Sequence, residues 1–134
     1  MNPVRATALA CLMPLSDLGD EPFLVDDRGQ HAMCARWAAA HGYDLTCRLS
    51  LHRLPAGHPT LWRDVDRGLV DVFVAPHRRA LEHAVDDADA FAARCAAAGV
   101  RLATADLDEP VYDRALTSGV HRRLSMPTAG YSGR

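Results

Sequence analysis

Apolar residues along the chain fall into two patterns, short continuous runs and longer stretches in which they recur at helical spacing. The short runs are typical of buried strands, and the recurring stretches are typical of helices that bury one side. The predicted strands are Val4–Leu12, Tyr43–Leu51, Leu69–Ala75 and Val100–Ala105. The predicted helices run from Asp26 or Asp27 to about His41, from the capping residue Thr60 to Gly68, and over Val85–Ala98.

This alternation of strands and helices predicts the α/β fold class. Short connections from strand to helix to strand favour a parallel four-stranded sheet with helices on both faces. Leu69–Ala75 is β-branched and aromatic, and we expect both of its faces to be buried. Pro76–His83 is polar and basic, and we expect it to be a connection at the carboxyl end of that strand. The stretch before Asp26 holds two prolines, a glycine and several acids, which predicts a loop.

The end of the chain differs in composition from the rest. Residues 107–134 contain Pro110, Pro127, several glycines and scattered serine and threonine. We therefore expect an α/β domain over residues 1–106 and a separate tail over residues 107–134. Within the tail, a helical turn is expected around Val111–Leu116, and the last ten residues are expected to be flexible.

Composition narrows the class of protein. The 134 residues are 49% hydrophobic and 24% charged, which is typical of a globular domain with its own core. Fifteen basic residues, all of them arginine, face seventeen acidic ones, for a net charge of −2. This balance excludes nucleic-acid binding by bulk positive charge, although a local basic patch remains open. Arginine without lysine, together with abundant alanine, indicates a GC-rich genome.

The sequence also bears on location and redox state. It contains no apolar run of about 18 residues, so no membrane span is expected. The apolar stretch near the N-terminus is too short for a signal peptide, which favours a cytoplasmic location. Four cysteines lie far apart and form no CxxC pair, which predicts free buried thiols. They are Cys11, Cys34, Cys47 and Cys95.

Several short motifs occur in a particular order between Arg5 and Ala105. They are Gln30 on the first helix, His41-Gly42-Tyr43 at its end, His58-Pro59-Thr60-Leu61, Gly68 to Val74 with Asp71, Arg78-Arg79, and Gly99-Val100-Arg101-Leu102. This order resembles the catalytic domain of the serine recombinases, the resolvase and invertase family. The resemblance implies a flavodoxin-like strand order of 2-1-3-4.

The chain departs from that family at the positions that carry its chemistry. The family serine, which attacks a DNA phosphodiester, is matched by Met13, and the arginine two residues earlier is matched by Cys11. The arginine of the family's Arg-Pro block is matched by His58. The family's Asp-Arg-Leu-x-Arg motif is reduced to a stretch that begins His77-Arg78-Arg79. A thioether cannot form a phosphoester, and loss of a nucleophile removes nearly all covalent catalysis.

The resemblance therefore implies a catalytically inactive relative of a serine recombinase that needs no cofactor. Active members continue into a long crossover helix and a DNA-binding region, which the tail does not resemble. The expected partner is a second copy of the chain or a recombinase-like protein. Alternatives are a DNA-associated accessory protein, residual cleavage through Ser16, and an unrelated small α/β enzyme with a site at the carboxyl ends of the strands.

Arg78 and Arg79 are the candidate anion- or DNA-binding residues, together with His77. Ligands of open α/β sheets bind beyond the carboxyl ends of the strands, which is where these side chains are expected. Arg53, His58, His83 and Arg101 are candidate neighbours of this site. The alternative is a solvated arginine pair near Glu82. Gln30 matches a family residue near the active site, or it is a glutamine on the helix surface.

Other residue clusters favour structural roles. His31 and Cys34 are one helical turn apart, and His52 and His58 share a loop, but neither pair has zinc-ligand spacing, so no metal site is expected. An acidic run at Asp86, Asp87 and Asp89 is explained by helix capping and the helix dipole. Trp37 and Trp62 are expected to pack in the core.

Overall fold

The computed structural model describes residues 3–13 and 22–108, and within them a four-stranded sheet flanked by helices. The strands are β1 (Arg5–Cys11), β2 (Asp44–Leu51), β3 (Val72–Ala75) and β4 (Arg101–Thr104). The helices are α1 (Pro22–Val25), α2 (Asp27–Ala40), α3 (Pro59–Asp66), α4 (Arg78–Ala84) and α5 (Ala88–Ala98). Every strand pair is parallel and the order is β2-β1-β3-β4, which confirms the predicted fold class and strand order.

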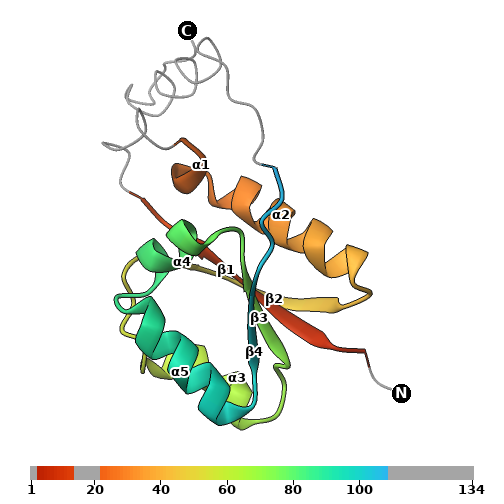
Figure 1. Ribbon diagram of the computed structural model, residues 1–134, viewed down its shortest axis with the longest axis vertical. Coiled ribbons are helices and arrows are strands. Elements are labelled where there is room, and N and C mark those ends of the chain that lie inside the picture. The colour runs from red at the N-terminus through yellow and green to blue at the C-terminus, as the bar shows by residue number, and fades with distance from the viewer. Residues whose placement is uncertain (1–2, 14–21, 109–134) are drawn as a thin grey trace, which may run out of the picture.

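The strand order determines where the helices lie. The chain moves outward from β1 to β2, then crosses back to β3 and continues to β4. Because crossovers between parallel strands are right-handed, this reversal places α2 on one face of the sheet and α3 to α5 on the other. Figure 1 shows that division, with α1 and α2 on one side and α3, α4 and α5 opposite.

One face of the sheet is packed by aromatic rings. The ring of Phe73 on β3 lies 5.8 Å from Trp62 of α3 and 5.2 Å from Phe91 of α5, measured between centroids. Trp62 and Phe91 lie 5.3 Å apart, which closes the triangle. All three side chains are buried. The prediction that Trp62 packs in the core is therefore confirmed.

Strand β1 contributes small residues to the core. Ala6, Ala8 and Ala10 of β1 are fully buried, and Ala8 pairs in register with Val74. The Cys34 thiol of α2 donates to the Val74 carbonyl at 3.6 Å. Since side chains alternate between faces along a strand, these three alanines share one face of β1, where their small size lets a neighbouring helix pack closely.

Two helices occur where connections were expected. The connection predicted over Pro76–His83 is wrong, because residues Arg78–Ala84 form α4. Its buried residues Ala80, Leu81 and Ala84 share one side of the helix, and this short apolar stripe is hidden among charged neighbours in the sequence. The loop predicted before Asp26 likewise contains the short helix α1, whose Phe23 and Leu24 are buried.

Several predicted element ends are also corrected. Helix α3 is capped by His58 rather than Thr60, since His58 Nδ1 accepts from the Thr60 N–H at 3.1 Å and Pro59 occupies the first turn. Helix α5 begins at Ala88, with Asp87 as its cap. Strand β3 begins at Val72, after the exposed Leu69.

The cysteines are free, and Cys11, Cys34 and Cys95 are buried as predicted, while Cys47 is half-buried. In the described part of the chain, no helix has the length and apolarity needed to cross a membrane. The predicted helical turn at Val111–Leu116 and the candidate nucleophile Ser16 lie outside the described residues.

Candidate functional site

The topology marks one edge of the sheet as the expected ligand site. The strand order reverses between β1 and β3, and open α/β sheets bind ligands beyond the carboxyl ends of strands at such a reversal. The residues gathered there come from the end of β1, from α1 and α2, and from the segment that follows β3. We call them the carboxyl-edge cluster: Cys11, Met13, Phe23, Leu24, Gln30, His77 and Arg79.

Gln30 is the structural centre of this cluster. Its side chain is fully buried, and its Oε1 accepts from the Cys11 N–H at 2.8 Å. Its Nε2 donates to the Cys11 carbonyl at 3.1 Å and to the Phe23 and Leu24 carbonyls, each at 3.2 Å. The amide thus pairs with the end of β1 as a neighbouring strand would, and it ties α1 to the sheet. The interpretation of Gln30 as a surface residue is wrong.

Cys11 is a protonated thiol in this arrangement. Its Sγ donates to the Leu24 carbonyl at 3.5 Å. Burial raises the pKa of the thiol from 9.0 to about 11, although the Gln30 hydrogen bond and the positive charge of Arg79 act in the opposite direction. A neutral thiol supplies no positive charge to a phosphate, and it is a weak nucleophile at neutral pH.

Met13 follows β1 and packs against the hydrophobic core. Its side chain is half-buried, and its thioether has neither an ionisable proton nor the capacity to form a phosphoester. At Met13 the chain therefore contributes apolar packing.

Arg78 points away from the cluster toward two carboxylates. Its Nε lies 3.2 Å from Glu82 Oε2, and its second guanidinium nitrogen lies 2.7 Å from Asp89 Oδ1. Hydrogen bonds to Asp89 and Glu82 raise the pKa of the guanidinium. The positive charge is thus compensated twice, which weakens its attraction for a further anion.

Arg79 and His77 stay at the cluster. Arg79 is half-buried on α4, and its charge lowers the pKa of the Cys11 thiol at the end of β1. The His77 ring lies 5.3 Å from Phe23, and its Nδ1 lies 3.8 Å from Asp106 Oδ1. Of the two candidate arginines, Arg79 therefore occupies the expected ligand edge.

The remaining candidate neighbours lie elsewhere. The His58 side chain caps α3, and the Arg53 N–H bonds the His83 carbonyl in the loop after β2. Arg101 lies on β4, where it contacts Tyr43. Within residues 3–13 and 22–108, no hydrogen bond or ring contact joins His58 or Arg101 to the cluster.

The acidic run has three separate structural roles. Asp86 accepts from the Ala56 N–H at 3.0 Å, Asp87 caps α5 through the Ala90 N–H at 2.9 Å, and Asp89 pairs with Arg78. For the residues that the structure describes, no group of three or more histidine, cysteine or acidic side chains has the arrangement to hold a metal ion.

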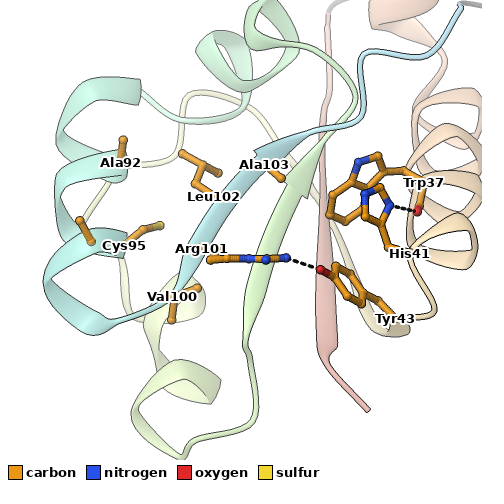
Figure 2. A pocket seen from close by; sticks show the side chains of 10 residues that line it. Trp37, His41, Tyr43, Ala92, Cys95, Val100, Arg101, Leu102 and Ala103 are labelled. Carbon is orange, nitrogen blue, oxygen red and sulfur yellow. Dashed lines mark hydrogen bonds between the residues drawn. The ribbon is translucent and has the colours of Figure 1, made fainter.

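Sequence reasoning missed a hollow along the outer edge of β4. We call it the β4 trough; it measures about 520 Å³ and is drawn in Figure 2. It is lined by Trp37, His41, Tyr43, Ala92, Cys95, Ala96, Val100, Arg101, Leu102 and Ala103. Trp37 is half-buried and belongs to this lining, so its predicted core role holds only in part. The aromatic residues grouped at the end of α2 were the one available signal.

Comparison with known proteins supports the fold but gives no closer relative. No family model and no curated protein matches the chain. Among solved structures, the chain is similar to the C-terminal catalytic domain of ISC1926 TnpA, an IS607-like serine recombinase. The TM-score is 0.59 and the identity 18%, over 81% of this chain and 71% of that one. The chain therefore has the fold of a serine recombinase catalytic domain, as the resemblance implied.

Proposed function

We propose that this chain is a non-cleaving protein with a serine recombinase catalytic fold, and that it acts through protein contacts. The observation that supports this most directly is the apolar packing of Met13, the residue that the resemblance matches to the family nucleophile. The expected partners are a second copy of the chain or an active recombinase.

The surroundings of Met13 point the same way. Phosphoryl transfer needs uncompensated positive charge around the transferring group. Cys11 is neutral at this edge, and Arg78 is held by Glu82 and Asp89. The Gln30 amide is occupied by four backbone groups. Arg79 is the remaining arginine of the cluster, and one arginine without a nucleophile does not cleave DNA.

The cleavage test looks for covalent protein–DNA adducts. The full chain is incubated with supercoiled plasmid and with duplex DNA, quenched in denaturant, and compared with an active serine recombinase on its own substrate. We expect neither adducts nor nicking. Adducts that disappear on Ser16→Ala would overturn the proposal and identify Ser16 as a substitute nucleophile, while adducts that persist would point to a different one.

The contact test measures assembly. Light scattering over a concentration series is expected to show self-association, or co-elution is expected with an active recombinase that shares the fold. A chain that stays monomeric and pairs with no such protein would contradict the proposed mode of action.

The salt dependence of DNA binding distinguishes the alternative role as a DNA-associated accessory protein. A protein that binds duplex DNA through phosphate contacts loses affinity steeply as salt rises. We expect no duplex binding even at low ionic strength. Binding that Arg79→Ala abolishes, with Arg36→Ala as the surface control, would favour the accessory role instead.

A further inference from the structure

The β4 trough lies on an edge of the sheet with unused hydrogen-bonding groups. In the part of the chain that the structure describes, β4 pairs with β3 alone. The N–H groups of Arg101 and Ala105 point inward, to the Asp71 carbonyl at 3.1 Å and the Ala75 carbonyl at 2.8 Å. Because backbone groups alternate along a parallel strand, those of Leu102 and Thr104 point outward. Such an edge is a template for a further strand.

The two walls of the trough differ in chemistry. Figure 2 shows Leu102 and Val100 on the side of α5, and Arg101 directed across to the aromatic residues at the end of α2. On the α5 side, Ala92 and Ala96 leave room for large side chains of a partner. Small apolar residues beside a strand edge allow another chain to approach closely.

The opposite wall is aromatic. Trp37 and His41 lie 4.3 Å apart between ring centroids, and Tyr43 lies 5.5 Å from Trp37 and 5.4 Å from His41. The His41 Nδ1 is bonded to the Trp37 carbonyl at 2.8 Å, which fixes the ring against the end of α2. The wall is therefore a prebuilt surface rather than a set of loose side chains.

Arg101 gives the aromatic wall a positive charge. Its guanidinium carbon lies 5.3 Å from the centre of the Tyr43 ring, and it donates to the Tyr43 hydroxyl at 2.6 Å. Arg5 and Arg78 each pair with a carboxylate, whereas no carboxylate among residues 3–13 and 22–108 lies within ion-pair distance of Arg101. Its charge is held in place and left uncompensated within this region.

We propose that the β4 trough binds an extended acidic peptide segment of a partner protein by strand addition. Main-chain bonds to the outer edge of β4 would supply affinity, and alternate side chains would supply specificity. Acidic side chains face Arg101 on one wall, and apolar side chains face the alanines on the other. This inference deepens the proposed role in protein contacts by naming one partner surface.

The probe is an eight-residue peptide with blocked ends that alternates glutamate and valine and carries a fluorescent label. Fluorescence polarisation against the full chain is expected to show saturable binding at submillimolar concentration. A peptide N-methylated at alternate residues keeps its side chains but loses main-chain donors, and it is expected to bind at least tenfold more weakly. A lysine–valine peptide is expected not to bind.

The variants test the wall itself. Arg101→Glu is expected to weaken binding of the glutamate–valine peptide at least tenfold and to permit binding of the lysine–valine peptide. Arg94→Glu is the matched control, because Arg94 also lies over an aromatic ring, 4.8 Å from the centre of Trp62, but does not line the trough. It is expected to leave affinity within twofold.

Three outcomes would overturn the inference. They are the absence of saturable binding, equal binding of the N-methylated peptide, and equal weakening by Arg94→Glu and Arg101→Glu. If the peptide does not bind and the chain is a dimer that Arg101→Glu dissociates, the edge belongs to a second copy and the peptide proposal fails. DNA adduct formation is measured separately, so failure here leaves the proposed lack of cleavage standing.

Discussion

The carboxyl-edge cluster and the β4 trough lie at two edges of one sheet, and their polar side chains are used in opposite ways. At the cluster, the Gln30 amide and the Cys11 thiol are both engaged in hydrogen bonds to the backbone. At the trough, aromatic rings and a guanidinium surround a hollow of about 520 Å³. Among the described residues, Gln30 and Cys11 fill the first edge with their own hydrogen bonds, whereas the described hollow of the trough lies at the second.

The same contrast applies to arginine. Arg78 was singled out from the sequence, yet two carboxylates compensate its charge. Arg101 was only a candidate neighbour, yet it faces the trough with a tyrosine as its partner. The comparison teaches that a charge becomes available for binding through its surroundings rather than through its motif.

The largest expected effect on stability comes from removing the Gln30 side chain from the carboxyl-edge cluster. Gln30→Ala removes four hydrogen bonds, among them the side-chain bonds to the buried N–H and carbonyl of Cys11. We expect the free energy of unfolding to fall by about 3 kcal/mol, since each buried unsatisfied group costs roughly 1–3 kcal/mol. Urea denaturation measures this change in the free energy of unfolding. Arg36→Ala, an exposed change on the same helix, should stay within about 0.5 kcal/mol of the parent.

The next effect is alkaline sensitivity at the same edge. The pKa of Cys11 is about 11 in the folded chain against an ordinary 9.0, so above pH 9 the unfolded chain loses this proton first. Stability is therefore unchanged by this thiol below pH 9 and is lost as the pH rises toward 11, by at most roughly 1.4 kcal/mol per pH unit. Buried Cys34 and Cys95, whose pKa values are raised to about 12, act in the same direction.

Unfolding curves between pH 8 and pH 10.5 measure this loss. Cys11→Ala should show a shallower decline than the parent over that range. Equal slopes for the two chains would mean that the thiol is not buried as a neutral group.

A smaller effect is expected at the other end of β1. The Thr7 side chain is buried, and its Oγ1 has no hydrogen-bond partner among the described residues. Thr7→Val keeps the shape and removes the unsatisfied hydroxyl, so we expect a gain of about 1 kcal/mol in the free energy of unfolding. A loss of stability in thermal and urea unfolding would show that the hydroxyl does have a partner.

The smallest expected effects compare two arginines over aromatic rings. Arg101→Gln and Arg94→Gln each remove an exposed cation–π contact, which is typically worth about 0.5–1 kcal/mol. We expect similar small losses of stability from the two changes, measured by thermal unfolding. A much larger loss from Arg101→Gln would mean that this side chain holds β4 in place rather than facing a ligand.

The fold was predictable because its signals are local. Strand β3 is a continuous apolar run, and α5 is rich in alanine with an aspartate at its start. Helix α4 escaped prediction because its buried stripe is three small or apolar residues between arginines, a glutamate and a histidine. Periodicity over so short a segment is weak, and the burial that stabilises it comes from the sheet.

The candidate site was harder to predict, because its character depends on distant partners. Gln30 is buried because its side-chain amide bonds to the backbone of Cys11 at the end of β1, which lies 19 residues earlier in the chain. Tyr43 and Arg101 are 58 residues apart and meet only in the folded sheet. The resemblance singled out Cys11 and Met13, but burial and neutralisation of charge are properties of the packing.

Helix α2 carries residues of both edges. Gln30 lies in its first turns and holds the end of β1, while Trp37 near its other end forms part of the trough wall. Its fourteen residues make a helix of roughly 21 Å, which the Cys34 thiol also ties to the Val74 carbonyl of β3. Loss of the Gln30 hydrogen bonds would let α2 move and would shift Trp37 at its other end. The emission of Trp37 in the Gln30→Ala chain would register that mechanical linkage, and an unchanged spectrum would show that the two ends move independently.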